Sequence, residues 1–490
     1  MRKIYFNFLI LYLVFMILFS INCKTLSKNS SIFYNFSDVN IIDIDYSTNK
    51  RYQTKELTLE NDAKVIIKQS SNTNITISFY LKTPNLYQTR LDSGVEKIIL
   101  LYIKEIFTNA LLRNNLNLAS DLSIEGNTDF SRFSFAVDPV NVNKILSLFL
   151  DSLLIKEWDL NLLDEILSRE KNNFINNYKT NNEFYINYSL EKYVFNANPV
   201  FNSFDGNSVS LVLLNFDTIN EYYNNNFSGK RMLLLIYGNV DSNFNFNFVN
   251  FSSNFKIKDF SERTYNRFVS SRFKLTPYYL PVKESNKNAI LMAFYKSPSF
   301  LNDEYFTYLV TLEILKENAN LIFPETAKIR FDSMMINITN YGRILFYAKP
   351  ENILQKILTF RRLIDFYKNG LGFLFYYDKE NDSIIREYKN QTDDKLVSMN
   401  INYILRKAKN KVLSDYNFTD LNSVDKEKKY IAIYFLLNKE ISYFNIKERI
   451  EIISYEDIVV LAKKIFTNFS WAVATDPEQL KKISKDFFTL

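Results

Sequence analysis

Two of the residue types that most often carry out chemistry, histidine and cysteine, are absent or nearly absent from this chain. The 490 residues include no histidine and one cysteine, Cys23. Without histidine the chain has no imidazole to bind zinc, to act as a general base or to change charge near neutral pH. Ser-His-Asp and Cys-His catalytic groups are therefore excluded, and a lone cysteine forms neither an intramolecular disulfide nor a cysteine-based metal site. The candidates for a catalytic, metal-binding or modification role that we consider next are the carboxylates and Cys23 itself.

Three glutamates, Glu96, Glu105 and Glu125, are candidates for carboxylate chemistry. Acidic side chains on helix faces are usually solvated, so we expect surface positions for them rather than a catalytic or metal-binding role. Asp43 and Asp45 form a D-x-D pattern that is equally typical of a surface. The sequence contains no G-x-x-x-x-G-K-[ST], G-x-G-x-x-G or G-x-S-x-G motif, so phosphate-binding loops, dinucleotide sites and nucleophile elbows are not indicated.

The position of Cys23 favours lipidation. Two basic residues precede an apolar run over residues 4–19, and residues 20–22 (Ser-Ile-Asn) lead directly to the cysteine. A positive start, an apolar stretch and small residues before a cleavage point define a secretory signal, whereas a transmembrane anchor needs about 20 apolar residues. The pattern resembles a loose bacterial lipobox of the spirochaetal kind. It implies a signal peptide over residues 1–22 and acylation of Cys23, the alternative being an incidental cysteine.

Lipidation of Cys23 implies a place in the cell envelope, on the outer or inner membrane and on its periplasmic or surface face, with membrane lipid as the first partner. Residues 23–38 are polar and rich in Ser and Asn, which is typical of a flexible tether. The net charge of +6 is spread over 60 basic and 54 acidic residues. Because no dense basic run is present, we do not expect nucleic acid as a partner.

The rest of the chain carries one pattern twice. Residues 75–84 alternate in hydrophobicity like a half-buried strand that ends at Pro84, and residues 289–298 do the same and end at Pro298, 214 residues later. In each half a helical pattern, a second alternating strand, a second proline and a second helix follow. These patterns cover residues 95–107, 133–137, Pro139 and 142–154 in the first half, and 305–315, 343–348, Pro350 and 353–364 in the second.

The repeat predicts two similar α+β domains. Pro139 and Pro350 lie 211 residues apart, close to the first offset, although β-α-β-α patterns are common enough to coincide by chance. Shorter strands are expected before each repeat, at residues 64–68 and 273–279, and a last strand at 471–475. We place the domains at residues 39–258 and 273–490, joined by a polar linker over residues 259–272.

Four segments of the first half carry a family resemblance. In chain order they are residues 59–65 (LENDAKV), Asn198-Pro199, residues 216–223 (FDTINEYY) and residues 233–241 (LLLIYGNVD). They resemble the "L-x-N-G-hydrophobic-x-V" strand, the "H-P" pair, the "T-x-x-D-hydrophobic-x-x-F-Y" helix and the strand ending in "G-D-hydrophobic" of the insulinase (pitrilysin-like, M16) peptidases. Asp62 and Asn198 depart from that pattern. The resemblance implies two α+β halves, each a mixed sheet packed by helices.

The resemblance also locates where a zinc site should be. Active members of this family carry H-x-x-E-H on a helix, in which two His bind zinc and the Glu activates water, and a third ligand, a Glu, comes from a later helix. Aligning Gly94 with the family's "G-L-A-H-F-L-E-H" puts Lys97 and Leu101 at the two His and Leu100 at the Glu. Residues 170–177 resemble "E-R-x-x-h-x-x-E", which puts Asn177 at the third ligand, 76 residues after Leu101.

All four zinc-site positions thus carry residues that cannot do the family's chemistry, so we expect no catalytic residue, no metal and no cofactor. The resemblance implies a non-catalytic lipoprotein that binds peptide or supports an active M16 partner. One alternative is a surface-exposed binding lipoprotein that uses the fold as a scaffold. Another is an active metallopeptidase with an atypical site.

Overall fold

The computed structural model describes residues 54–82, 88, 91–127, 130–195, 204–241, 244, 246–255, 278–282, 289–298, 300, 302–322, 330–333, 340–369, 376–378, 383–385, 394–437, 443–467 and 469–487. The chain divides into two compact units, Met1–Asp45 and Tyr46–Leu490, and every described residue belongs to the second. The predictions on the signal peptide, Cys23, the tether and the linker therefore lie outside the described residues.

Sheet A, in the first half of the chain, has six strands in the order β1-β2-β6-β3-β5-β4. The strands are β1 (Thr54–Thr58), β2 (Lys64–Gln69), β3 (Ile75–Lys82), β4 (Ser123–Gly126), β5 (Phe130–Val137) and β6 (Met232–Gly238). β2 and β6 are parallel, and the other neighbouring pairs are antiparallel. The alternating run that ends near Pro84 is thus the central strand β3.

Sheet B, in the second half, has five strands in the order β7-β13-β8-β10-β9. The strands are β7 (Tyr278–Pro281), β8 (Ala289–Ser297), β9 (Arg330–Ser333), β10 (Asn340–Ala348) and β13 (Ser470–Thr475). β7 and β13 are parallel, and β13 pairs with β8, β8 with β10 and β10 with β9 in antiparallel fashion. A separate hairpin joins β11 (Tyr376–Asp378) to β12 (Ser383–Ile385).

The two halves repeat one arrangement. The order β2-β6-β3-β5-β4 of sheet A recurs in sheet B as β7-β13-β8-β10-β9, with the parallel pair at the same place. In each half the second repeat strand leads through a proline-initiated 3₁₀ turn into a helix, at Pro139–Asn141 and at Pro350–Asn352. The prediction of two similar α+β halves is confirmed. The final strand expected at residues 471–475 is β13, the counterpart of β6.

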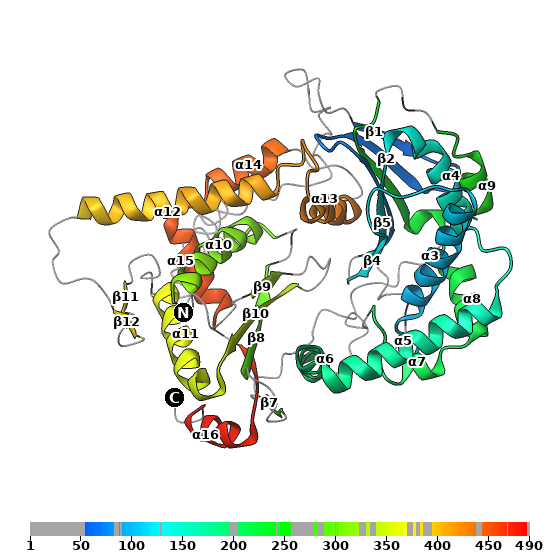
Figure 1. Ribbon diagram of the computed structural model, residues 1–490. Coiled ribbons are helices and arrows are strands. Elements are labelled where there is room, and N and C mark those ends of the chain that lie inside the picture. The colour runs from blue at the N-terminus through cyan, green and yellow to red at the C-terminus, as the bar shows by residue number, and fades with distance from the viewer. Residues whose placement is uncertain are drawn as a thin grey trace, which may run out of the picture. The chain divides into compact units, whose positions relative to one another are not determined.

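The helices also recur in matching order (Figure 1). The first half has α3 (Val95–Arg113), α4 (Val142–Leu153), α5 (Leu160–Thr180), α6 (Asn182–Phe195), α7 (Ser210–Leu213), α8 (Phe216–Asn226) and α9 (Val249–Asn254). The second has α10 (Tyr305–Ile322), α11 (Ile353–Lys368), α12 (Asp394–Asp415), α13 (Val424–Leu437), α14 (Tyr443–Glu451), α15 (Tyr455–Ile465) and α16 (Pro477–Phe487). None of the helices in the described part of the chain is both long and apolar enough to cross a membrane.

Each sheet buries both of its faces. Side chains alternate between the two faces of a strand, and in β2 Val65 and Ile67 join the core beneath α3, α4, α5 and α8, whereas Ile66 joins the core that contains α13. In sheet B, Leu291 lies in the core with α10, α11 and α15, whereas Met292 packs in the cluster that includes Ile186 of α6. A sheet covered on both faces explains the nearly continuous apolar runs in its central strands.

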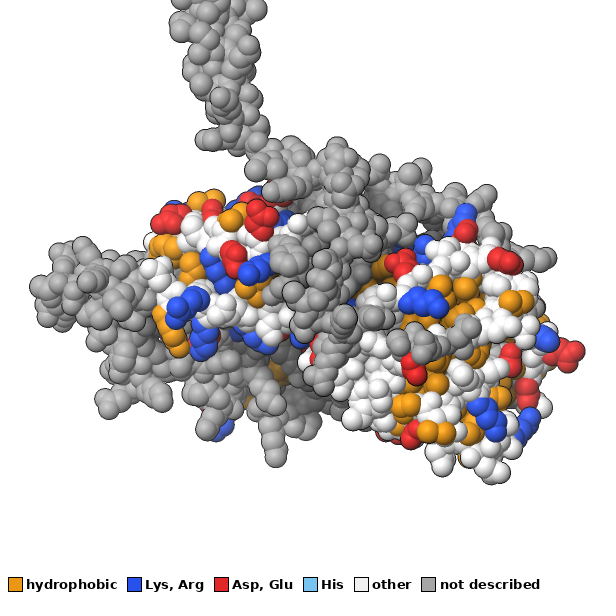
Figure 2. Space-filling model, turned by 90° about the horizontal axis from the view of Figure 1, so that it is seen from above, with side chains coloured by type: hydrophobic (Ala, Val, Ile, Leu, Met, Phe, Trp, Pro, Cys, Tyr) orange, Lys and Arg blue, Asp and Glu red, His pale blue; other side chains and the backbone are white. Residues whose placement is uncertain are grey.

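The two halves therefore exchange a helix. α13 from the second half covers the outer face of sheet A, on the side away from α3 and α4 (Figure 1), and α6 from the first half packs on the outer face of sheet B. Figure 2 shows acidic and basic side chains intermixed with hydrophobic ones on the face that it displays. This agrees with the nearly balanced charge of the sequence.

Candidate functional site

The helix expected to carry the zinc motif is α3, and a pair of glycines shapes its start. Gly94, at the N-cap of α3, has φ +91°, a conformation that favours glycine. A Cβ atom at Gly94 would lie 2.8 Å from the Cα of Gly206, so the two backbones come too close for a side chain there. This close approach brings Asp205 to the first turn of α3.

Lys97, at the position expected for the first histidine, forms two ion pairs. Its Nζ lies 2.7 Å from Oδ1 of Asp205 and 2.9 Å from Oε2 of Glu170 on α5, and the Lys97 side chain is 23% exposed. Burial alone would lower the pKa of Lys97, but Asp205 and Glu170 outweigh burial and raise it. The ammonium group is therefore held in its charged form between two carboxylates, and a protonated amine has no lone pair for a metal.

The other three positions offer no catalytic or metal-binding group either. Leu100 is buried, Leu101 is half-buried against the core of the first half, and Asn177 is exposed in the last part of α5. Lys97 thus contacts α5, the helix that carries the expected third ligand position Asn177. The residue of α5 that it contacts, however, is Glu170. The zinc ion that the family resemblance implies does not fit here, because Lys97 is held protonated and Leu101 has no donor atom. The nearby carboxylates of Glu170 and Asp205 are engaged by the lysine.

Glu96 does not lie at the surface, where we expected it. We predicted a solvated carboxylate, but Glu96 is fully buried and paired with Arg231, whose Nη2 lies 3.0 Å from Oε2. Tyr222 donates to the same oxygen at 2.8 Å, and Ser131 donates to Oε1. Burial and the nearby Glu96 charge raise the pKa of Tyr222. The expectation was wrong because the first turn of α3 faces the interior and Arg231 supplies the countercharge.

The other carboxylates lie nearer the surface. Glu105 pairs with Arg169 of α5 at 3.0 Å, and both side chains are partly exposed. Glu125, on β4, accepts from Arg132 at 2.8 Å and pairs with Lys428 of α13 at 2.5 Å. Among the described residues no group of three or more acidic side chains is placed to hold a metal. Asp43 and Asp45 lie outside the described residues.

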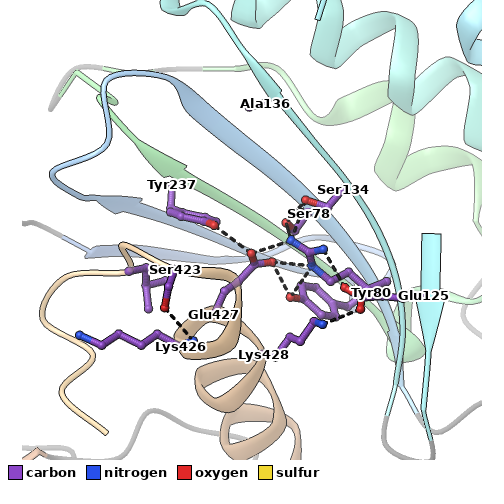
Figure 3. A network of polar contacts seen from close by, with 12 residues as sticks. Ser78, Tyr80, Glu125, Ser134, Ala136, Tyr237, Ser423, Lys426, Glu427 and Lys428 are labelled. Carbon is purple, nitrogen blue, oxygen red and sulfur yellow. Dashed lines mark hydrogen bonds and ion pairs between the residues drawn. The ribbon is translucent and has the colours of Figure 1, made fainter. Parts of the chain in front are cut away.

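A buried polar cluster that the sequence did not indicate joins sheet A to α13 (Figure 3). Arg132 donates from Nε to Oε1 of Glu427 at 2.9 Å and from Nη2 to Oε2 at 2.7 Å. Tyr80 donates to Oε1 at 2.5 Å and Tyr237 to Oε2 at 2.9 Å. Burial and then Glu427 raise the pKa values of both tyrosines. In the sequence, the one indication of this cluster was Arg132, a charged residue within the mostly apolar strand β5.

The comparisons with known proteins bear on the fold. No family model matches the chain, and no curated protein matches it in sequence. Solved structures that match it in fold include a protease from Helicobacter pylori (TM-score 0.65, 14% identity, covering 86% of this chain and 99% of that one). A chain of complex III2 from Candida albicans (TM-score 0.61, 10% identity, 88% and 99%) and the first half of the periplasmic protease PqqL from Escherichia coli (TM-score 0.63, 10% identity, 88% and 93%) also match.

These matches identify the fold. The chain has the M16 peptidase-like fold, with two similar α+β halves, and two of its structural neighbours are proteases. Identities of 14% and 10% show the fold alone, so they do not transfer activity to this chain. What the chain does must be argued from its own residues.

Proposed function

We propose that this protein is a non-catalytic, M16 peptidase-like lipoprotein that binds peptide or supports an active M16 peptidase. The observation that carries the proposal is the ion-paired Lys97. It occupies the expected place of a zinc ligand and places one positive charge between the carboxylates of Glu170 and Asp205. The ammonium group offsets part of the negative charge of those carboxylates, and it would repel a divalent cation at this place.

The lack of a general base is a second support. Metallopeptidases of this motif use a glutamate to take a proton from the metal-bound water, and the side chain at that position is the buried Leu100. Glu96, the nearest carboxylate in sequence, is engaged by Arg231, Tyr222 and Ser131. Every group that could substitute in the first turns of α3 thus already has a structural partner.

The supporting role draws on the use of this fold in assemblies. The Candida albicans neighbour is a chain of complex III2. A fold that serves inside an assembly suits a subunit that contributes surface rather than chemistry. We propose that the partner here carries an intact H-x-x-E-H motif, and that lipid on Cys23 holds this chain at the envelope where the partner works.

A cleavage assay tests the non-catalytic role. The purified full chain, in detergent, is incubated with a mixed peptide library with and without a chelator, beside the Lys97→Met variant. We expect no cleavage above the level of a mock preparation. Cleavage that copurifies with the chain, stops with chelator and changes in the variant would contradict the proposal.

The anchor is tested separately. Cells that express the chain are fed an alkyne-labelled fatty acid, and labelling is compared with the Cys23→Ser variant. We expect label and membrane association in the parent and the loss of both in the variant. Equal membrane association of the unlabelled variant would contradict lipid anchoring and leave the non-catalytic role untouched.

A further inference from the structure

Three side chains of sheet A form a receptor for one carboxylate. Tyr80, Arg132 and Tyr237, called the cradle here, direct four hydrogen bonds at Glu427 of α13 (Figure 3). Glu427 is fully buried, and 3% of the Arg132 side chain is exposed. A carboxylate in such a place must keep its partners, because burying an unpaired charge is strongly unfavourable.

Sheet A assembles the cradle by itself. Tyr80 is the cross-strand partner of Arg132. The arginine is also held by Glu125, which accepts from Nη1 at 2.8 Å, and by Ser134, which accepts from Nη2 at 2.9 Å. All these residues lie on β3, β4 and β5 of the first half. The sheet therefore presents an oriented guanidinium group independently of the helix that docks on it.

The duplicated sheet B differs at these places. Strand register makes Phe294 and Arg343 of sheet B the counterparts of Tyr80 and Arg132. Other counterparts follow from the same registers: Ala474 for Tyr237, Met292 for Ser78 and Leu345 for Ser134. Sheet B thus keeps an arginine but has no hydroxyl at any of these positions. Its outer face packs instead in an apolar and aromatic cluster that includes Ile186 of α6.

We propose that this difference selects which exchanged helix docks on which sheet. A duplicated chain has two similar outer faces and two similar helices, so the arrangement without exchange, with α6 on sheet A and α13 on sheet B, is a competing arrangement. On sheet B, Glu427 would lose both tyrosine hydroxyls. On sheet A, Arg132 would lose the carboxylate of Glu427, which accepts hydrogen bonds from two of its nitrogens. Buried ion pairs often add little net stability, and in some proteins they fix one arrangement against its competitors.

A disulfide reporter makes the docking measurable. Cys23 is the only cysteine, so the full chain with Cys23→Ser, Ser71→Cys and Asp420→Cys has a single thiol pair. Ser71 and Asp420 contact each other across the docked arrangement, with Oγ 2.6 Å from Oδ2. The chain is unfolded in urea with reductant, refolded, and then oxidised. The crosslinked share of the folded fraction reports α13 on sheet A.

Glu427→Gln is compared in this background with Glu96→Gln. Both glutamates are fully buried and paired with arginine, but Glu96 lies within the first half. We expect Glu427→Gln to shift the balance toward uncrosslinked folded protein by about tenfold, and Glu96→Gln to lower stability without changing the crosslinked share. Equal crosslinking in Glu427→Gln and the parent would overturn the proposal.

A second variant covers the case in which Glu427→Gln does not fold. Arg132→Met with Glu427→Leu replaces the pair by apolar side chains, an exchange that often preserves stability. We expect this variant to fold and to crosslink incompletely, because apolar surfaces no longer distinguish the two faces. Full crosslinking of this folded variant would show that the cradle does not select the helix.

Discussion

Lys97 stands where the family resemblance places a metal-binding histidine, and its side chain brings a positive charge to that position. Lys97 bridges Asp205 and Glu170, which come from a turn and a helix far apart in sequence. The zinc-site positions themselves could be located from the sequence, because they follow from an alignment along α3. The lysine's partner Asp205 could not, because it lies 108 residues away and reaches α3 only through the close approach of two glycines.

Removing this cation should weaken the protein moderately. In Lys97→Met the two carboxylates lose their shared partner, and we expect a loss of about 1 kcal/mol in the free energy of unfolding, since Asp205 is half exposed. Urea denaturation measures the change. Lys144→Met, at an exposed position of α4, is the control and should lie within about 0.5 kcal/mol of the parent. Equal losses in both variants would mean that the ion pairs contribute nothing.

The same contact should have a defined pH dependence. The pKa of Lys97 is raised above its ordinary 10.5, so the folded state holds the proton more tightly than the unfolded state does. Its contribution is complete below pH 10.5 and is lost as the pH rises through the raised pKa. Denaturation curves of parent and Lys97→Met, taken at increasing pH, should therefore converge above pH 10.5. A gap that widens with pH would contradict the assignment.

At the scale of elements, the start of α3 depends on backbone geometry. Gly94→Ala forces a side chain into φ +91° and toward the Cα of Gly206. We expect a loss of about 2 kcal/mol in the free energy of unfolding, measured by urea denaturation. Asn115→Gly, at φ +53° beyond the other end of the helix, is the opposite control and should be neutral or slightly stabilising. An unchanged Gly94→Ala protein would show that the turn at Gly206 moves freely.

Hydrophobic alternation was sufficient to predict the central strands and the duplication, because each strand places every second residue in a core. It did not predict the helix exchange. The sequence patterns of α6 and α13 indicate helices, but they do not indicate which sheet each helix covers. Glu427 lies in the charged stretch DKEKK, which is typical of an exposed first turn. Its burial depends on Tyr80, Arg132 and Tyr237, which lie 347, 295 and 190 residues earlier in the chain.

At the scale of the whole molecule, buried tyrosines should control alkaline unfolding. Burial raises the pKa values of Tyr80, Tyr222, Tyr367 and Tyr416 well above normal, and that of Tyr223 to about 12. Neutral phenols stabilise the fold below their ordinary pKa, and this contribution falls as the pH rises above it. Tyrosinate absorbance should therefore rise in two steps, the second together with loss of circular dichroism. A single step for all 33 tyrosines with the fold intact would contradict this.

We propose that the M16 peptidase-like fold of this protein works without a metal. The most direct measurement is the zinc content of the purified full chain, by elemental analysis after dialysis against buffer that contains micromolar zinc. We expect far less than one zinc per chain, and no change in Lys97→Met. Zinc bound one to one, released by chelator and lost when Glu170 is replaced by Gln, would contradict it.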